Sequence, residues 1–84
     1  MGNLFVLWDP DDDPRGNCQH IAGRGISQEE VEGVLERPLR RKVSRSSGRP
    51  IAFGYTAAGR LIAVVSDEVE RGLVYPVTAF EVEP

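Results

Sequence analysis

Segment 26–38 does most to constrain the fold, because it carries both the start and the stop signal of one short helix. Ser27 and Glu30 have the spacing of a capping box, in which each side chain accepts a hydrogen bond from the backbone N–H group of the other residue. Pro38 cannot continue the helix, since it lacks an N–H group and restricts the residue before it. The sequence therefore predicts a helix over residues 27–37, with one apolar side facing the core.

After this helix the hydrophobic period changes to two, which is typical of strands. Residues 51–55 alternate in this way, residues 61–65 are apolar on both faces as in a central strand, and residues 73–82 form a third run. The polar residues 66–72 predict a loop before the last run. Pro76 lacks a backbone N–H group, so the last strand is expected at a sheet edge or beside a bulge. A free edge there could pair with a second copy of the chain, which makes a homodimer one expectation.

Upstream of the capped helix, residues 4–8 form a short apolar run that predicts a first strand, closed by an acidic loop with two prolines. Residues 17–24 predict a brief helix, and Gly25 is expected to end it in the left-handed conformation. The complete order of elements is β-α-α-β-β-β-β. We therefore expect an α+β fold in a single domain over residues 1–84, with a short N-terminal strand, two helices and then a four-strand antiparallel sheet.

Composition limits the classes of function that the chain can support. Its single cysteine, Cys18, cannot form an internal disulfide, which favours a reducing compartment such as the cytoplasm. No apolar run reaches the roughly 18 residues that a membrane-spanning helix needs, so no membrane association is expected. Asp9, Asp11 and Asp13 resemble the start of a calcium-binding loop, but Pro14 stands where that loop requires glycine. One cysteine and one histidine cannot complete a structural zinc site, and we expect no metal and no cofactor.

Charge is distributed unevenly along the chain. The net charge is −3, yet residues 37–60 hold seven basic side chains and no acidic one. A local concentration of positive charge attracts anions even when the whole protein is acidic, so this segment is expected to meet an anionic partner. The alternative is that these cations only neutralise the acidic helix beside them, since surface charge runs are commonly just solvated.

The first 38 residues carry a set of motifs that resembles a known family. The motifs are Phe5-x-x-Trp8-Asp9-Pro10, then Asn17, then Gly25-Ile26-Ser27-x-Glu29-Glu30-Val31-x-x-Val34-Leu35. They are similar to the start of the BrnT group of bacterial toxins, and the remaining residues resemble that group mainly in the order of their strands. The resemblance implies a RelE-like fold and the role of toxin in a type II toxin–antitoxin system. It also implies metal-independent cleavage of RNA and neutralisation by a ribbon-helix-helix antitoxin protein.

RNA cleavage requires a group that moves protons and groups that stabilise the charge on the scissile phosphate. Histidine is the residue type that changes charge near neutral pH, and His20 is the only histidine, so it is the first candidate for the catalytic acid or base. Arg45 and Arg49 are the candidate catalytic phosphate clamp, because guanidinium groups donate paired hydrogen bonds. Further residues are expected to bind the RNA substrate: Arg40, Arg41, Lys42, Ser46, Ser47, Tyr55 and Arg60.

These candidate residues also have structural alternatives. A lone histidine is commonly a surface or helix-end residue. Tyr55 and Trp8 could stack on bases, but aromatic side chains are commonly core residues. Two positions depart from the family pattern, since Arg24 stands where the family has a histidine before glycine and Phe80 stands where its last strand has an arginine. A second hypothesis therefore accompanies the first: the chain is a catalytically inactive, toxin-like binding module that docks an acidic protein partner or nucleic acid.

Overall fold

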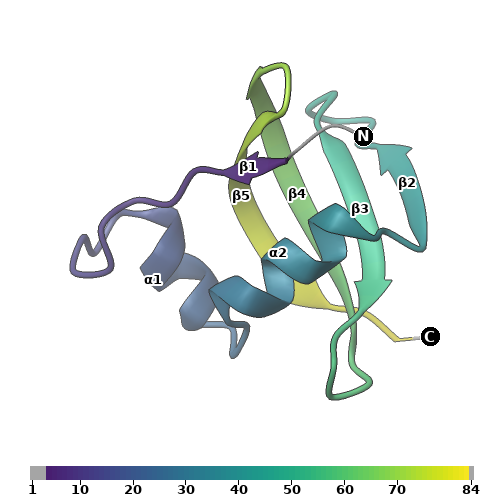
Figure 1. Ribbon diagram of the computed structural model, residues 1–84, viewed down its shortest axis with the longest axis horizontal. Helices are drawn as coiled ribbons and strands as arrows, with labels where there is room; N and C mark the ends of the chain where they lie inside the picture. The colour runs from purple at the N-terminus through teal and green to yellow at the C-terminus, as the bar shows by residue number, and fades with distance from the viewer. Residues whose placement is uncertain (1–3, 84) are drawn as a thin grey trace.

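A computed structural model describes residues 4–83 and confirms the predicted order of elements (Figure 1). The elements are β1 (Phe5–Val6), α1 (Asn17–Ala22), α2 (Gln28–Glu36), β2 (Arg40–Val43), β3 (Pro50–Tyr55), β4 (Leu61–Glu70) and β5 (Leu73–Glu81). All five strands belong to one sheet, in the order β1-β5-β4-β3-β2. The fold is therefore α+β, as the change of period in the sequence predicts.

The N-terminal strand joins this sheet, which the sequence did not predict. Strands β2 to β5 pair antiparallel, as expected for the four-strand sheet. Strand β1 pairs parallel with β5, so the sheet has five strands and is mixed. The backbone N–H of Phe5 donates to the carbonyl of Gly72 over 2.7 Å, and that of Leu7 donates to the carbonyl of Val74 over 2.8 Å.

The expectation of a loop over residues 66–72 was wrong. Strand β4 continues to Glu70, and only a tight turn at Arg71 and Gly72 separates it from β5. Gly72 has a φ of 81°, a conformation that glycine adopts without strain. Beyond the buried Ser66 the strand extends past the core, so neither of its faces needs apolar residues there. A strand without a buried face leaves no alternating pattern in the sequence.

The bulge expected at Pro76 is present. Val65 pairs with Thr78 and Ser66 pairs with Pro76, so one extra residue of β5 lies between the two pairs. The side-chain amide of Asn17 donates to the carbonyl oxygen of Pro76 over 3.0 Å. At this position helix α1 therefore lies beside β5 and occupies the edge that a second strand would need.

Both helices begin and end close to the predicted residues. In α2 the Glu30 N–H donates to the Ser27 hydroxyl over 3.1 Å, and the Ser27 N–H donates to the Glu30 carboxylate over 3.0 Å, which confirms the capping box. Helix α1 ends at Ala22, two residues before the predicted end. Gly25 has a φ of 78°, which confirms the left-handed position predicted there.

The helices cover one face of the sheet. In Figure 1, α2 crosses the sheet and α1 lies beside β5. The buried core combines residues of both layers: Ile21, Ile26, Val31, Val34, Leu35, Ala52, Ile62, Val64 and Ala79. Because side chains alternate along a strand, the neighbours of the four sheet residues in this core point to the opposite side. This second side, here called the open face, is lined centrally by Ile51, Phe53, Ala63, Val65, Thr78 and Phe80.

Two glycines should respond oppositely to replacement by alanine. Gly33 is exposed inside α2 and a Cβ atom there would meet nothing within 4 Å, so Gly33→Ala is expected to stabilise the fold by about 0.5–1 kcal/mol. Gly54 lies in β3 beneath α2, where a Cβ atom would lie 3.2 Å from Cγ1 of Val34. Gly54→Ala is therefore expected to destabilise it by about 1 kcal/mol. Thermal unfolding of both variants tests the pair, and a shift in the same direction would contradict the packing of α2 on β3.

Candidate nucleic-acid interface

Aromatic side chains lie on the open face of the sheet. The strand register places Phe53, Ala63 and Phe80 side by side on β3, β4 and β5. Ala63 has no exposed surface although it points away from the helices, because the two larger phenylalanines flank it. Tyr55 follows Phe53 by two residues on the same side of β3 and is 53% exposed. Aromatic rings on a sheet surface are suitable platforms for stacking unpaired bases.

Cations border these rings along the edge strand β2. Arg40 pairs with Phe53, and Lys42 pairs with Ile51, so both side chains belong to the open face. The guanidinium carbon of Arg40 lies 5.9 Å from the centre of the Phe53 ring, a cation–π distance. Arg41 lies between them in the strand and therefore points to the helix side. Two of the three basic residues predicted to bind RNA in this strand, Arg40 and Lys42, therefore lie on the open face, and Arg41 does not.

The turn between β2 and β3 holds the predicted phosphate clamp. Arg45 is exposed, whereas the Nε atom of Arg49 donates to a carboxylate oxygen of Asp67 on β4 over 2.8 Å. This bond fixes the orientation of the Arg49 guanidinium and leaves its two terminal nitrogen atoms available for a phosphate. The Ser47 hydroxyl accepts from the backbone N–H of Arg49 over 3.3 Å. The Ser46 hydroxyl lies 3.3 Å from that of Ser44. The two predicted residues Ser46 and Ser47 therefore contribute to the shape of the turn.

His20 lies at the opposite border of the open face. It is exposed on α1, and its Nε2 atom lies 3.0 Å from the hydroxyl of Thr78 on β5. Arg49 directly precedes β3, and His20 contacts β5. Strand β4 lies between β3 and β5, so these two strands are about 10 Å apart, or two strand spacings. The structure therefore brings His20 and Arg49 to the same face without bringing them into contact.

A hollow of about 460 Å³ lies beside His20, between the start of α1 and β5. Arg15, Tyr75 and Val77 line it together with His20. Arg15 supplies a cation close to the histidine, which the sequence did not indicate because Arg15 lies outside the basic segment. Thr78 was likewise missed, since only the strand register shows which side of β5 it occupies.

Tyr75 and Asp9 form a hydrogen bond at the edge of this hollow. The Tyr75 hydroxyl donates to Oδ2 of Asp9 over 2.6 Å, and the same oxygen accepts from the backbone N–H of Asn17 over 2.9 Å. The Tyr75 bond first, and then the Asn17 bond, hold the pKa of Asp9 below its ordinary value of 3.8. The same hydrogen bond, with burial, raises the pKa of Tyr75 above 10.0.

These two shifts predict how stability depends on pH. A lowered pKa for Asp9 means that its contribution is present above pH 3.8 and is lost as the pH falls through the folded-state value. A raised pKa for Tyr75 means that its contribution is present below pH 10.0 and is lost as the pH rises through the folded-state value. Tyr75→Phe is therefore expected to lower Tm near neutral pH and to weaken its dependence on pH at both ends. Tyr55→Phe is the control, and an equal change in both variants would contradict the role of the Asp9 bond.

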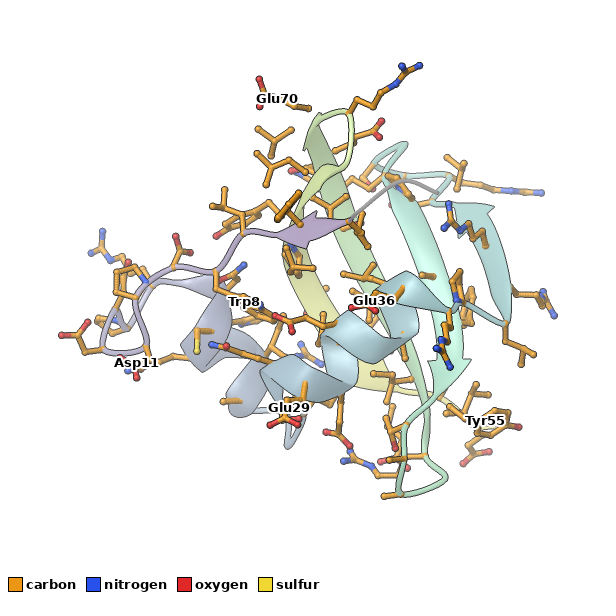
Figure 2. The ribbon with its side chains drawn as sticks, viewed as in Figure 1. Trp8, Asp11, Glu29, Glu36, Tyr55 and Glu70 are labelled. Carbon is orange, nitrogen blue, oxygen red and sulfur yellow. The ribbon has the colours of Figure 1, made fainter. Side chains whose placement is uncertain are left out.

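Two other predicted residues lie away from the open face. Arg60 is at the β3–β4 turn, where it donates to the carboxylate of Glu81 over 3.2 Å and to the carbonyl of Gly25 over 2.9 Å. These contacts join the turn to the α1–α2 loop and to β5. Trp8 is half-buried against the core, and its indole N–H donates to Glu32 of α2 over 2.7 Å. Figure 2 shows Trp8 between β1 and α2, whereas Tyr55 projects outward at the far end of β3.

Ion pairs account for few of the cations in residues 37–60. Within the described residues 4–83, Arg49 and Arg60 are the members of this basic segment that form ion pairs. The sole ion pair with α2 there joins Arg60 to Glu30 over 3.7 Å. Neutralisation of the acidic helix therefore does not explain the remaining cations.

The described part of the chain has no group of three histidine, cysteine or carboxylate side chains that could hold a metal ion. None of its helices has the length and apolar character needed to cross a membrane. Comparisons of the chain with protein-family models, with curated proteins and with solved structures give no match.

Proposed function

We propose that this protein binds single-stranded RNA across the open face of its sheet and cleaves it without a metal ion. The observation that carries the proposal is the arrangement of Phe53, Phe80 and Tyr55 between the cations of β2 and the histidine on α1. The rings provide stacking surfaces, and Arg40 and Lys42 provide charge for the phosphates. Together with the motifs of the first 38 residues, this arrangement favours the toxin of a type II toxin–antitoxin system.

The reaction requires a base for the 2′-hydroxyl of the ribose and an acid for the leaving oxygen. The 2′-oxygen attacks phosphorus, the bond from phosphorus to the 5′-oxygen breaks, and a 2′,3′-cyclic phosphate and a 5′-hydroxyl result. His20 is the proposed acid or base, oriented by its contact with Thr78. Arg15 and the arginines of the β2–β3 turn, Arg45 and Arg49, are the proposed sources of positive charge for the phosphates.

Induced expression in a bacterial host, with growth and total RNA followed over time, tests this proposal. Growth arrest with fragmented RNA is the expected result. Cleavage by the purified protein should persist in a chelator and leave cyclic phosphate ends. Normal growth with intact RNA, or cleavage that stops in the chelator, would contradict the proposed reaction.

His20→Ala is expected to slow RNA cleavage by the purified protein by about 10², the usual contribution of a general acid or base. The side chain is exposed, so the variant should fold normally. RNA affinity, measured separately, should change little because the stacking residues remain. A cleavage rate equal to that of the unmodified protein would remove His20 from the mechanism.

A catalytically inactive binding module is the second candidate function. It is favoured by the surroundings of His20, whose imidazole ring has one hydrogen-bond partner among residues 4–83, a threonine rather than a second acid or base. In this case RNA, or an acidic protein partner, would bind without being cleaved. We also propose that a ribbon-helix-helix antitoxin is a partner and that the protein acts in the cytoplasm, both from the sequence motifs and the single cysteine.

A further inference from the structure

We propose that the helix side of the protein holds a docking site for an acidic segment of a partner protein that carries one large apolar side chain. The site is a hollow of about 710 Å³ where the end of α2, strand β2, the β4–β5 turn and the start of β1 meet. It lies on the side of the sheet opposite to the open face. The RNA proposal and this one therefore use different surfaces, and each can fail without the other.

Three arginines from separate elements line this hollow. Arg37 caps the end of α2, Arg41 points to the helix side from β2, and Arg71 lies in the β4–β5 turn. No hydrogen bond or ion pair within residues 4–83 engages any of their guanidinium groups. Free guanidinium groups bind carboxylates through paired, charge-assisted hydrogen bonds, so the rim of the hollow is complementary to glutamate and aspartate side chains.

Part of the lining of the hollow is apolar, and this part continues into a second hollow. Leu4 and Leu35 line both this hollow and a smaller, more enclosed one of about 220 Å³, which also reaches Ala52 and Val74. An apolar cavity of about 150 Å³ is enough to hold a benzene ring. The inner hollow therefore has room for one leucine or phenylalanine side chain, the kind of buried anchor that dominates the affinity of an interface.

Acidic residues limit where the partner can lie. Figure 2 shows Glu29 and Glu36 along the outer side of α2, and Glu36 also lines the edge of the hollow. Glu68 lines the inner hollow. In a symmetric pair, a second copy of this chain would bring its own arginines against the three arginines of this hollow. An acidic segment would instead be repelled by α2 and held at the arginines. Charge therefore favours an acidic partner that passes between β2 and the β4–β5 turn.

Binding of two short synthetic peptides, measured by fluorescence anisotropy, tests the proposal. The first has one leucine flanked on both sides by glutamates, and the second has serine in place of the leucine. The unmodified protein should bind the leucine peptide at least tenfold more tightly than the serine peptide. Arg41→Ala combined with Arg71→Ala should weaken binding of the leucine peptide about tenfold. Arg24→Glu changes the net charge equally at an exposed site outside the hollow and should leave the affinity nearly unchanged.

Several outcomes would overturn the docking site. Equal affinity for both peptides would exclude the apolar anchor, and an equal loss in the Arg24→Glu control would reduce the effect to net charge. Absence of binding to the leucine peptide would also contradict the proposal. Displacement of the bound peptide by a single-stranded oligoribonucleotide would show that the hollow belongs to the RNA path instead.

Discussion

Replacing Arg45 and Arg49 together with alanine is expected to abolish the growth arrest caused by the induced protein. Arg49 is the cation of the β2–β3 turn whose guanidinium is held in one orientation, by the 2.8 Å bond from its Nε atom to Asp67. Its terminal nitrogen atoms and the exposed Arg45 can then donate to the same phosphate region. In the proposed reaction, the negative charge that develops on the scissile phosphate would then lose its stabilising donors at this end of the open face.

The fold should tolerate this double change. The side chain of Arg49 is 41% exposed and that of Asp67 is 47% exposed, so their ion pair contributes little to stability. Circular dichroism and Tm should therefore match those of the unmodified protein. Arg24→Glu lowers the net charge by the same amount away from the open face and should still arrest growth. If growth arrest survives in the double variant, the turn arginines have no part in the activity.

Asn17→Ala is expected to have the largest effect on stability, a loss of about 3 kcal/mol. Asn17 is only 3% exposed, and its side-chain amide donates to the carbonyl oxygens of Leu7 and Pro76, each over 3.0 Å. Its side-chain oxygen accepts from the backbone N–H of Asp9 over 2.9 Å. Alanine would leave the buried carbonyl of Pro76 and the partly buried carbonyl of Leu7 without their donor, and each unpaired buried group costs about 1–3 kcal/mol.

Chemical denaturation measures this effect, because a domain of this size is stable by only roughly 4–12 kcal/mol in total. Gln19→Ala is the matched control on the same helix. Gln19 is exposed and donates one hydrogen bond, to the carbonyl of Asp11, so its loss should change stability by about 0.5 kcal/mol or less. Equal effects of the two variants would contradict the role of Asn17 as the link between the first strand, α1 and β5.

The sequence predicts best those features that depend on neighbouring residues. The capping box of Ser27 and Glu30 and the left-handed Gly25 are confirmed, because their hydrogen bonds span only a few positions. The pairing of β1 with β5 was not predicted. It joins Phe5 to Leu73, and a two-residue ladder between such distant positions has no local signal.

The candidate site is predictable in its residue types but not in its arrangement. His20 reaches the open face from α1 by its contact with Thr78 of β5, and Arg49 reaches it from the β2–β3 turn by its bond to Asp67 of β4. Neither contact has a local signal in the sequence. In the sequence, Phe80 is notable only because it differs from the BrnT pattern. In the structure it lies beside Ala63, with Phe53 on the other side of Ala63. Which side of the sheet the helices cover decides the surroundings of Phe80, and alternation within one strand cannot reveal that choice.

The pairing of the first strand with the last has a consequence for synthesis on the ribosome. The ribosome releases the N-terminal residues first, so Phe5–Val6 leaves the exit tunnel long before its partner Leu73–Val74 has been translated. The buried side-chain amide of Asn17 likewise cannot form its hydrogen bond to the carbonyl oxygen of Pro76 until Pro76 has been translated. A nascent chain can form its two helices early, but it cannot close the sheet until nearly all of this sequence is free of the tunnel. The open face is therefore assembled only after β5 has left the tunnel, and a nascent chain without β5 lacks the surface on which RNA would bind.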